Sequence, residues 1–369
     1  MVKFNKRNFV IGIAAGLAIV AGVVLLARPA SAQTTERIDS VLLKDAASRA
    51  SLQNADWTVT PAGYAQFQWS YSSMGDEVHG FEMDRVGIGL QGVSKDGSSS
   101  FVIDGAFVED GMSFELENAW FRTGAFDMFD LRAGQFRPNV SFENGVGSGQ
   151  LLTLDRSILN STFASSYTQG VEGAFDVGYV GVSAFILNGW EESTFDYTTN
   201  TDSEYGFGVR ATLSLMGDEA ARTSYVQHTD DHLWLGGSVY LDDDRTIFIA
   251  DVDGQWSRLG LAAAGAYADI DGMEDNAWAV SVTPSFAFTD NITGYGRYEY
   301  GEMDSDDTLN IVTAGANVNL VGSAVRWTSE VGYTLDDLSG SWDTSDTGWH
   351  GASVEDGEFI FSSGFTIVF

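Results

Sequence analysis

The sequence predicts an all-β protein that forms a transmembrane, antiparallel β-barrel of 16 strands. First, apolar residues alternate with small or polar residues from Trp57 onward, and side chains alternate between faces along a strand. Second, the chain has 42 glycines, four prolines and 13% aromatic residues, a mixture typical of short strands joined by glycine-containing turns. Third, it ends in an alternating strand and a terminal Phe369, as a barrel that closes its sheet in lipid must do.

Composition excludes several functional classes. The net charge is −33, and removing Lys3, Lys6, Arg7 and Arg28 with the predicted leader leaves 15 basic and 52 acidic residues, a charge of −37. Such an acidic surface repels a phosphate backbone, so no nucleic-acid partner is expected. Cysteine is absent, which excludes disulfides, thiolate metal sites and cysteine nucleophiles.

Residues 1–32 are predicted to be a cleaved export signal. A basic start containing Lys3, Lys6 and Arg7 precedes an apolar run from Phe9 to Ala27, and Ala30-Ser31-Ala32 forms a small-x-small cleavage site. The alternative is a transmembrane anchor, because the apolar run is long for a signal. The site after the run favours cleavage and delivery to the outer membrane.

Residues 33–56 are predicted to be a periplasmic N-terminal segment. Apolar residues recur at near-helical spacing over 36–53, which predicts a short helix that plugs the barrel mouth or supports oligomerisation. A frayed linker is an equal alternative, because a helix of this length is marginal in isolation. The barrel is predicted to occupy 57–369.

Sixteen candidate strands follow from the alternation. They are expected near 58–71, 79–92, 98–109, 112–124, 127–137, 167–177, 178–189, 204–216, 231–241, 245–256, 258–270, 276–289, 292–303, 308–320, 324–335 and 355–369. In the strand near 204–216, Phe207, Val209, Leu213 and Leu215 oppose Gly208, Arg210, Thr212 and Ser214. The number of such strands, with no second apolar sheet to pack on, favours a barrel over a sandwich.

An even strand number places both barrel ends on one side, which export assigns to the periplasm. Connections should therefore alternate between short inner turns and longer external loops. Predicted inner turns include 124–126, 176–178, Ser257, 289–291 and 321–323; 217–230 is long for one. The external loops concentrate acid, as at 242–244 and 304–307, which indicates either simple solvation or divalent-cation sites.

The third external loop, 138–166, is the longest connection, and a loop of this length is usually functional or disordered. It contains Leu151, Leu152, Leu154, Ile158 and Leu159, which is more apolar surface than a solvated loop carries. We therefore expect this third loop to fold into the lumen, pack on the wall and narrow the pore. The alternative is packing across a subunit contact.

Three short segments resemble the phosphate-selective porin O and P family of Gram-negative outer membranes. Leu131 to Pro138 resembles that family's strand before the constriction loop, and Leu154–Ser157 and Gln169–Gly173 resemble the segments after it. The resemblance spans roughly 57–369. It implies a trimeric, sixteen-stranded channel with an inward-folded third loop, and it assigns the terminal Phe369 to recognition by the barrel-insertion machinery.

The sequence departs from this family in its basic residues. Phosphate selectivity there depends on lysines and arginines, but only Lys44 and Lys95 remain after the leader, and neither is on a predicted strand or external loop. Arginine remains on the strands. Residues that share the small, polar face are predicted to line the pore, since a lipid-facing arginine at the midplane would cost ~2–4 kcal/mol. These are Arg85, Arg210, Arg297, Arg326 and Glu330.

A pore constriction is predicted around the third loop, with Arg132, Arg137 and Arg156 opposed to Glu143 and Asp155. Opposed charges would set a transverse field that orients polar solutes and selects ions. Equally, the same charges would tether the loop to the wall as structural ion pairs. Arg132 and Arg137 have opposite parity, which requires either a bulge or that Arg137 belongs to the loop.

Two other classes compete with a channel. An enzyme would need a nucleophile and base, but the only histidines are His79, His228, His232 and His350, and no nucleophile or phosphate-binding motif is evident. A closed barrel would instead serve as an envelope scaffold.

The sequence therefore predicts an outer-membrane porin for passive diffusion of small hydrophilic solutes and ions, with no cofactor or metal expected. The acidic mouth predicts a weak cation preference, while the arginines would favour a particular anion, such as phosphate, in a selective variant of this function. Expected partners are outer-membrane lipid and lipopolysaccharide, the insertion machinery and two further copies of the chain.

Overall fold

The computed structural model describes residues 52–53, 56–74, 78–108, 113–126, 129–190, 205–217, 231–271, 276–303, 307–322, 324–344, 347, 349 and 353–369. The predicted leader, most of segment 33–56, the long connection 218–230, His228 and His350 lie outside the described residues. Leu52–Gln53, the end of the predicted helix 36–53, are instead extended and form β1. They are extended because Leu52 and Gln53 pair with Val59 and Thr58 of the neighbouring strand.

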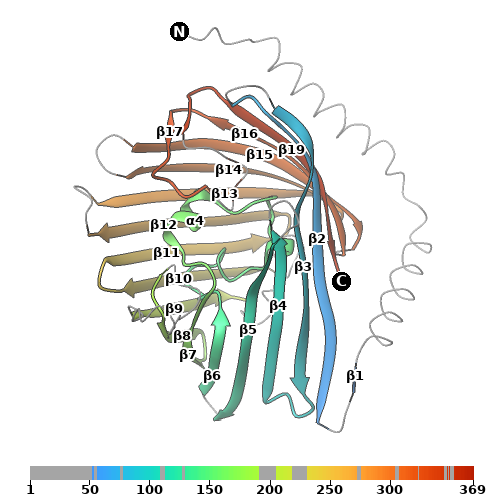
Figure 1. Cartoon of the computed structure of the whole chain (residues 1–369), viewed down its shortest axis with the longest axis vertical. Coiled ribbons are helices and arrows are strands. Elements are labelled where there is room, and N and C mark those ends of the chain that lie inside the picture. The colour runs from blue at the N-terminus through green and yellow to red at the C-terminus, as the bar shows by residue number, and fades with distance from the viewer. Residues whose placement is uncertain are drawn as a thin grey trace.

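Sixteen long strands form the barrel wall within the described residues (Figure 1). They are β2 (Trp57–Ser72), β3 (Val78–Ser94), β4 (Ser99–Val108), β5 (Ser113–Phe126), β6 (Phe129–Phe136), β7 (Thr168–Val177), β8 (Val180–Leu187), β9 (Gly206–Met216), β10 (His232–Leu241), β11 (Arg245–Trp256), β12 (Leu259–Ile270), β13 (Ala277–Thr289), β14 (Ile292–Met303), β15 (Asp307–Val321), β16 (Val325–Thr334) and β19 (Phe359–Val368).

Each strand pairs antiparallel with its sequence neighbours, and the sheet closes on itself. The last strand, β19, pairs with both β16 and the first long strand, β2. At the end of this seam, Phe369 N donates to Gly63 O and Gly63 N donates to Phe369 O, both at 2.9 Å. The predicted sixteen-stranded antiparallel barrel is therefore confirmed, including the partner of the final strand.

The alternation of side chains follows the prediction on the clearest strands. Along β9, Gly208, Arg210, Thr212 and Ser214 are buried, whereas Phe207, Val209 and Leu215 are exposed. On β19, Phe365 and Ile367 are exposed and Thr366 is buried. The exposed face is apolar around the barrel, as expected for a wall that meets lipid on its outside.

Short turns connect the strands at the end of the barrel where β2 begins and β19 ends. Ser257, Gly178 and Gly322 adopt positive φ in these turns. At the β3–β4 turn, hydroxyl and amide donors from Ser94 and Ser98 lower the pKa of the Asp96 carboxyl to about 2. One predicted turn, 124–126, is wrong: β5 continues to Phe126, because Phe126 pairs with Phe129 and extends the ladder.

The opposite end of the barrel carries the third loop and a second folded connection. The third loop contains a 3-10 turn, η2 (Ser148–Gln150), and a short helix, α4 (Ile158–Phe163). The connection between β16 and β19 forms a small hairpin of β17 (Leu338–Ser339) and β18 (Ser353–Val354). The two connections meet where the rings of Phe163 and Trp342 lie 6.2 Å apart.

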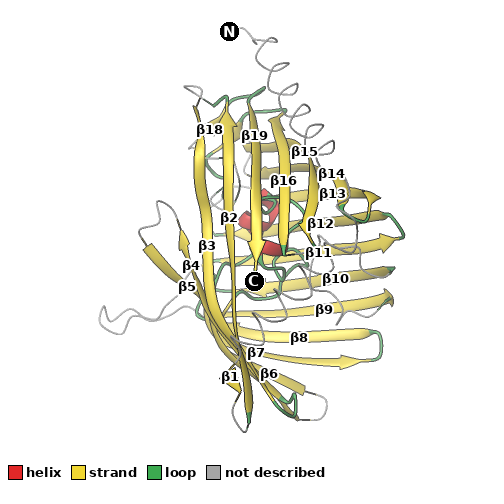
Figure 2. Cartoon of the chain, turned by 90° about the vertical axis from the view of Figure 1, so that its right-hand side faces the viewer, coloured by secondary structure: helices red, strands yellow, loops and turns green. Residues whose placement is uncertain are grey.

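The helix α4 is seen against the strands of the barrel in both views. It lies in front of β12 in Figure 1 and behind β16 in Figure 2. Its apolar side chains Ile158, Leu159 and Phe163 join a buried cluster that includes Trp342 and Leu338 of the β16–β19 connection. No helix in the described part of the chain is long and apolar enough to cross a membrane.

Candidate functional site

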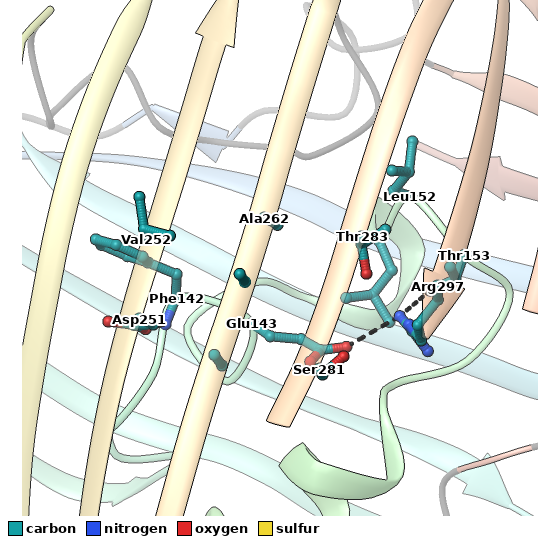
Figure 3. Close-up of a pocket in the computed structure, with 13 residues that line it drawn as sticks. Phe142, Glu143, Leu152, Thr153, Asp251, Val252, Ala262, Ser281, Thr283 and Arg297 are labelled. Carbon is teal, nitrogen blue, oxygen red and sulfur yellow. Dashed lines mark hydrogen bonds and ion pairs between the residues drawn. The ribbon is translucent and has the colours of Figure 1, made fainter. Parts of the chain in front are cut away.

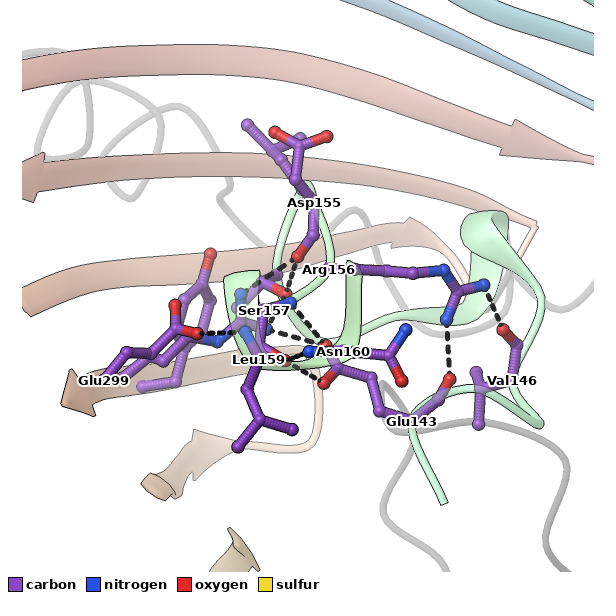
Figure 4. Close-up of polar contacts among 12 residues, drawn as sticks. Glu143, Val146, Asp155, Arg156, Ser157, Leu159, Asn160 and Glu299 are labelled. Carbon is purple, nitrogen blue, oxygen red and sulfur yellow. Dashed lines mark hydrogen bonds and ion pairs between the residues drawn. The ribbon is translucent and has the colours of Figure 1, made fainter. Parts of the chain in front are cut away.

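Internal hydrogen bonds fix the shape of the third loop. Arg156 donates to the backbone oxygens of Glu143 and Val146, both at 2.6 Å. The Glu143 carboxylate accepts from the backbone N–H of Ser157 at 2.8 Å and from its hydroxyl, while the Ser157 hydroxyl caps α4 by accepting from Asn160 N. The two arms of the loop are therefore tied together around residues 143 and 156–160 (Figure 4).

Arginines of the wall bind the loop on one side of the barrel. Arg210 of β9 donates to Val140 O at 2.8 Å and pairs with Asp251 of β11 at 2.9 Å. Arg297 of β14 pairs with Glu143 at 3.3 Å and donates to the Thr153 hydroxyl at 2.6 Å (Figure 3). Both arginines lie on the buried face of the wall, so they act on the loop from that face.

Wall carboxylates bind the same side of the loop by accepting from its backbone N–H groups. Asp251 accepts from Phe142 N. Glu330 of β16 accepts from Leu154 N and Glu299 of β14 accepts from Leu159 N, each at 3.2 Å. The strands from β9 to β16 therefore hold the loop at points spread from residue 140 to residue 159.

A small cavity lies on this anchored side. A cavity of about 50 Å³ lies between the loop and strands β11–β14, lined by Phe142, Glu143 and Arg297 among others. Figure 3 shows the Glu143–Arg297 pair bridging loop and wall across it. A space of this size holds water but no hydrated solute.

A much larger polar cavity, of about 690 Å³, lies on the other side of the loop, between residues 144–150 and strands β4–β7. A second cavity of about 340 Å³ adjoins it along β2–β5 and shares Asp104, Asn118 and Tyr167 as lining residues. We call the larger one the arginine cavity, because Arg122, Arg132, Arg137 and Arg156 all line it.

The charges of the arginine cavity nearly balance. Its carboxylates are Asp104, Asp130 and Glu172, so four arginines and three acids give a formal charge of +1. Asp130 pairs with Arg122, and Glu172 pairs with Arg132. Next to the cavity, Arg85 lies 4.0 Å from Glu117, so this pair contributes no net charge.

Aromatic rings cover the faces of two of these guanidinium groups. Arg137 lies 4.6 Å from the ring centroid of Tyr167, and Arg132 lies 4.0 Å from that of Phe136 and 5.8 Å from that of Trp120. Stacking restricts where each guanidinium can point. β6 ends at Phe136, so Arg137 belongs to the third loop. This explains why its parity differs from that of Arg132.

The structure brings some of the predicted constriction residues together and separates others. Arg132, Arg137 and Arg156 line one cavity as a group. Glu143 instead lies on the anchored side with Arg297, and Asp155 offers its backbone oxygen to Arg297 at 3.2 Å. Figure 4 shows the Asp155 carboxylate directed away from Glu143 and Arg156.

The five predicted pore-lining residues share the expected inward face, and each of them contacts the third loop. Arg210, Arg297 and Glu330 bind it as described, Arg85 donates to the Ser148 hydroxyl at 3.1 Å, and Arg326 lies 3.5 Å from Gly149 O.

At the acidic connection 242–244, Asp242 accepts from Arg245 N at 2.8 Å. That carboxylate therefore stabilises its own turn.

Sequence reasoning missed the wall carboxylates Asp251, Glu299 and Glu172. The sequence did contain a sign of them: each is an acidic residue that alternates with the small, polar face of its strand, and a nearby strand carries an arginine on the same face. For Asp251 a glycine adds a second signal, since a Cβ at Gly236 would lie 2.2 Å from Nη2 of Arg210 and would block the ion pair.

Known structures share this fold. The anion-selective porin from Comamonas acidovorans matches with a TM-score of 0.61 at 13% identity, over 85% of this chain and 100% of that chain. Outer-membrane expressed OmpT of Vibrio cholerae matches with a TM-score of 0.56 at 14% identity, over 86% of this chain and 100% of that chain. The chain therefore has the fold of an outer-membrane porin.

The family comparison agrees with the fold. The model for phosphate-selective porins O and P matches residues 61–239, which confirms the predicted resemblance over that range. No curated protein sequence matches the chain. The family match and the fold both support a channel function. Of the histidines that the structure describes, His79 is exposed on β3 and His232 lies 3.4 Å from Asp253.

Proposed function

We propose that the chain forms a water-filled channel in the outer membrane through which small hydrophilic solutes and ions diffuse down their gradients. The observation that carries this proposal is the polar cavity of about 690 Å³ inside a closed barrel whose exposed face is apolar. A barrel filled by side chains alone would leave no such space. Passage needs no chemistry and no energy coupling.

In this proposal the third loop lies in the lumen and divides it unequally. Its hydrogen bonds to the buried face of β9–β16 support this position. The 50 Å³ and 690 Å³ spaces on its two sides support a path that runs off-centre, along β4–β7. Pore width would then depend on residues 144–150, which face that wall.

Planar bilayer recording of the purified full-length chain tests the channel. We expect stepwise conductance increments in KCl, and liposomes containing the protein should swell in small sugars. A protein that inserts but carries no current would overturn the channel and favour the envelope scaffold. Ester or lipid hydrolysis that is lost on His79→Ala would favour an enzyme instead.

A second candidate function is an anion-selective channel, favoured by the excess of arginine over carboxylate in the arginine cavity. Charge at the narrowest point of a pore dominates ion choice, because low-dielectric walls focus its field. The acidic external connections favour cations instead. A reversal potential on the anion side in a KCl gradient supports the arginine-based filter, and one on the cation side supports control by the acidic mouth.

Assembly is part of the same proposal. Cleavage after Ala32, a periplasmic segment 33–56, insertion signalled by Phe369 and a homotrimer in lipopolysaccharide-containing membrane follow from the sequence and the family resemblance. Phe369 is 60% exposed at the barrel rim, which supports its availability to an insertion partner.

A further inference from the structure

The tip of the third loop, η2, lies against the place where the barrel closes on itself. The sheet closes where β19 pairs with β2, and the last register pair of this seam is Val368 with Tyr64. A Cβ added to Gly149 of η2 would lie 3.2 Å from a methyl group of Val368 and 3.3 Å from the Cβ of Tyr64. The loop therefore packs directly over the end of the seam.

Polar contacts extend this packing to the strands on either side of the seam. Arg85 of β3 donates to the Ser148 hydroxyl at 3.1 Å, and Arg326 of β16 lies 3.5 Å from Gly149 O. The order in the closed sheet is β16, β19, β2 and β3, so the tip reaches four consecutive strands. Because other parts of the loop are bound to β9, β11 and β14, the loop ties the seam to a distant part of the wall.

The seam is the part of the barrel where such support matters most. Its two strands come from the two ends of the barrel sequence, so pairing them carries the largest loop-closure entropy. The ladder also ends early, because β2 begins at Trp57, before Tyr64, and Thr58 and Val59 pair with β1 instead of β19. Strand ends fray first, and an edge that opens in hydrocarbon leaves backbone groups without hydrogen-bond partners.

The close approach of the loop to the seam explains the glycine at position 149. Gly149 does not have a positive φ, so its backbone conformation is open to other residues. The requirement is space, because a side chain there would press on the seam. Gly147 differs, since its φ is −64° and an added Cβ would meet only Gln150 Oε1, at 3.9 Å. The two glycines therefore form a matched pair, one against the seam and one clear of it.

From these contacts we propose that the third loop is an internal clasp for the barrel, whose tip, seated on Val368 and Tyr64, holds the first and last long strands together at the end of the seam. This role does not depend on whether solutes pass through the barrel. In the proposed channel it has a further consequence, because a seated tip fixes residues 144–150, which face the arginine cavity. Gly149 is then a positioning residue for the pore.

A disulfide tests whether the tip is seated, because the chain has no cysteine of its own. In full-length Gly149→Cys/Val368→Cys, a Cβ at residue 149 lies close enough to residue 368 for a disulfide. We expect the bond to form under mild oxidation, so that maleimide labels the two thiols only after reduction. Thiols that stay open to maleimide after oxidation would overturn the seating.

Ala174→Cys/Val368→Cys is the control for this cross-link. Ala174 lines the arginine cavity on β7, and six strand spacings of about 4.8 Å separate β7 from β19 along the wall. A disulfide cannot span that distance, so both thiols of the control should remain free after the same oxidation. A control that cross-links as readily as the test pair would also overturn the seating.

Hydrogen–deuterium exchange of the full-length protein tests the clasp itself. Gly149→Val lifts the tip from the seam. The backbone N–H groups of Val368 and Phe369, which donate to neighbouring backbone oxygens, should then exchange at least about tenfold faster than in the wild type, as expected for a frayed strand end. Gly147→Val adds the same side chain clear of the seam and should leave this exchange unchanged. Wild-type exchange in Gly149→Val, or equal acceleration in both variants, would overturn the clasp.

A milder variant and a current measurement complete the test. Should Gly149→Val not fold, Gly149→Ala adds only the Cβ and should accelerate the same exchange to a smaller extent, and wild-type exchange in that variant would overturn the clasp. A wild-type chain that carries no current, while the cross-link and the faster exchange are observed, would refute the proposed channel and leave the clasp. A conducting chain without the cross-link would do the reverse.

Discussion

The arginines have two different roles, anchoring the third loop and lining the large cavity, and their contacts distinguish the two. Arg210 and Arg297 each bind both a carboxylate and a polar group of the third loop. Arg132, which pairs with Glu172, and Arg137 both line a large cavity instead. Alternation along a strand predicts which face an arginine lies on, and it did so correctly for Arg210. It contains no information about what the side chain meets there, because that depends on strands and loops distant in sequence.

Replacing Arg210 tests the anchoring role. Its side chain and that of Asp251 are 1% and 3% exposed, so Arg210→Gln leaves a buried carboxylate without its cation. We expect a loss of ~3–5 kcal/mol in the free energy of unfolding, the usual cost of breaking a buried ion pair. Urea unfolding of the refolded barrel, followed by tryptophan fluorescence, measures it. A loss no larger than that of the exposed Arg258→Gln would contradict the anchoring role.

At the scale of elements, the third loop is held in place by hydrogen bonds within itself and to the barrel wall. Its arms are joined through Arg156 and Ser157, and carboxylates of β11, β14 and β16 hold its backbone. The sequence predicted that this loop packs on the wall, because its leucines needed burial. It left open whether the charged residues form a pore filter or tethers. For Glu143 the contacts favour a tether, since it meets Arg297 and Ser157.

Replacing Arg297 distinguishes a tether from a filter. Arg297→Gln removes the pairing with Glu143 and weakens the bond to Thr153, at a cost of about 2 kcal/mol for charged hydrogen bonds. We expect noisier open-channel current from a looser loop, with an unchanged reversal potential in a KCl gradient. Arg137→Gln should do the opposite and move the reversal potential toward cations. A shift of reversal potential in Arg297→Gln alone would reassign the filter to the anchored side.

The last strand shows what pairing adds to a sequence pattern. The alternation on β19 was readable from the sequence, and so was its partner, because a closed barrel with an even number of strands leaves only β2 for it. Strand ends were less predictable: β5 runs on to Phe126 and Arg137 falls outside β6. Pairing between neighbouring strands decides such boundaries, and no single strand contains that information.

Deleting Phe369 tests whether assembly and selectivity are separate. The deletion removes the two hydrogen bonds to Gly63 at the seam, and an aromatic ring at the rim. We expect less protein in the outer membrane but unchanged single-channel conductance in those channels that insert, because Phe369 lines only the adjoining smaller cavity and not the arginine cavity. Phe369→Tyr retains the ring and should insert normally. A changed conductance after the deletion would show that the C-terminus also shapes the pore.

At the scale of the whole molecule, the proposed channel depends on an unequal division of the barrel by the third loop. The sequence predicts the sixteen strands, the closed sheet and the loop that packs on the wall, since each follows from local alternation, strand number or apolar content. It does not predict on which side of the loop the open space lies. That depends on partners such as Arg210–Asp251 and Leu159–Glu299, which only the closed barrel brings together.

The absence of cysteine allows a direct test of the solute path. Ala174→Cys introduces one thiol into the arginine cavity, and Ser281→Cys introduces one into the small space beneath the loop. Both substitutions are close in size to the native residue. A charged, water-soluble methanethiosulfonate reagent, added during single-channel recording in KCl, should reduce the conductance of Ala174→Cys and leave that of Ser281→Cys unchanged. Block of Ser281→Cys with no effect on Ala174→Cys would contradict the path along β4–β7.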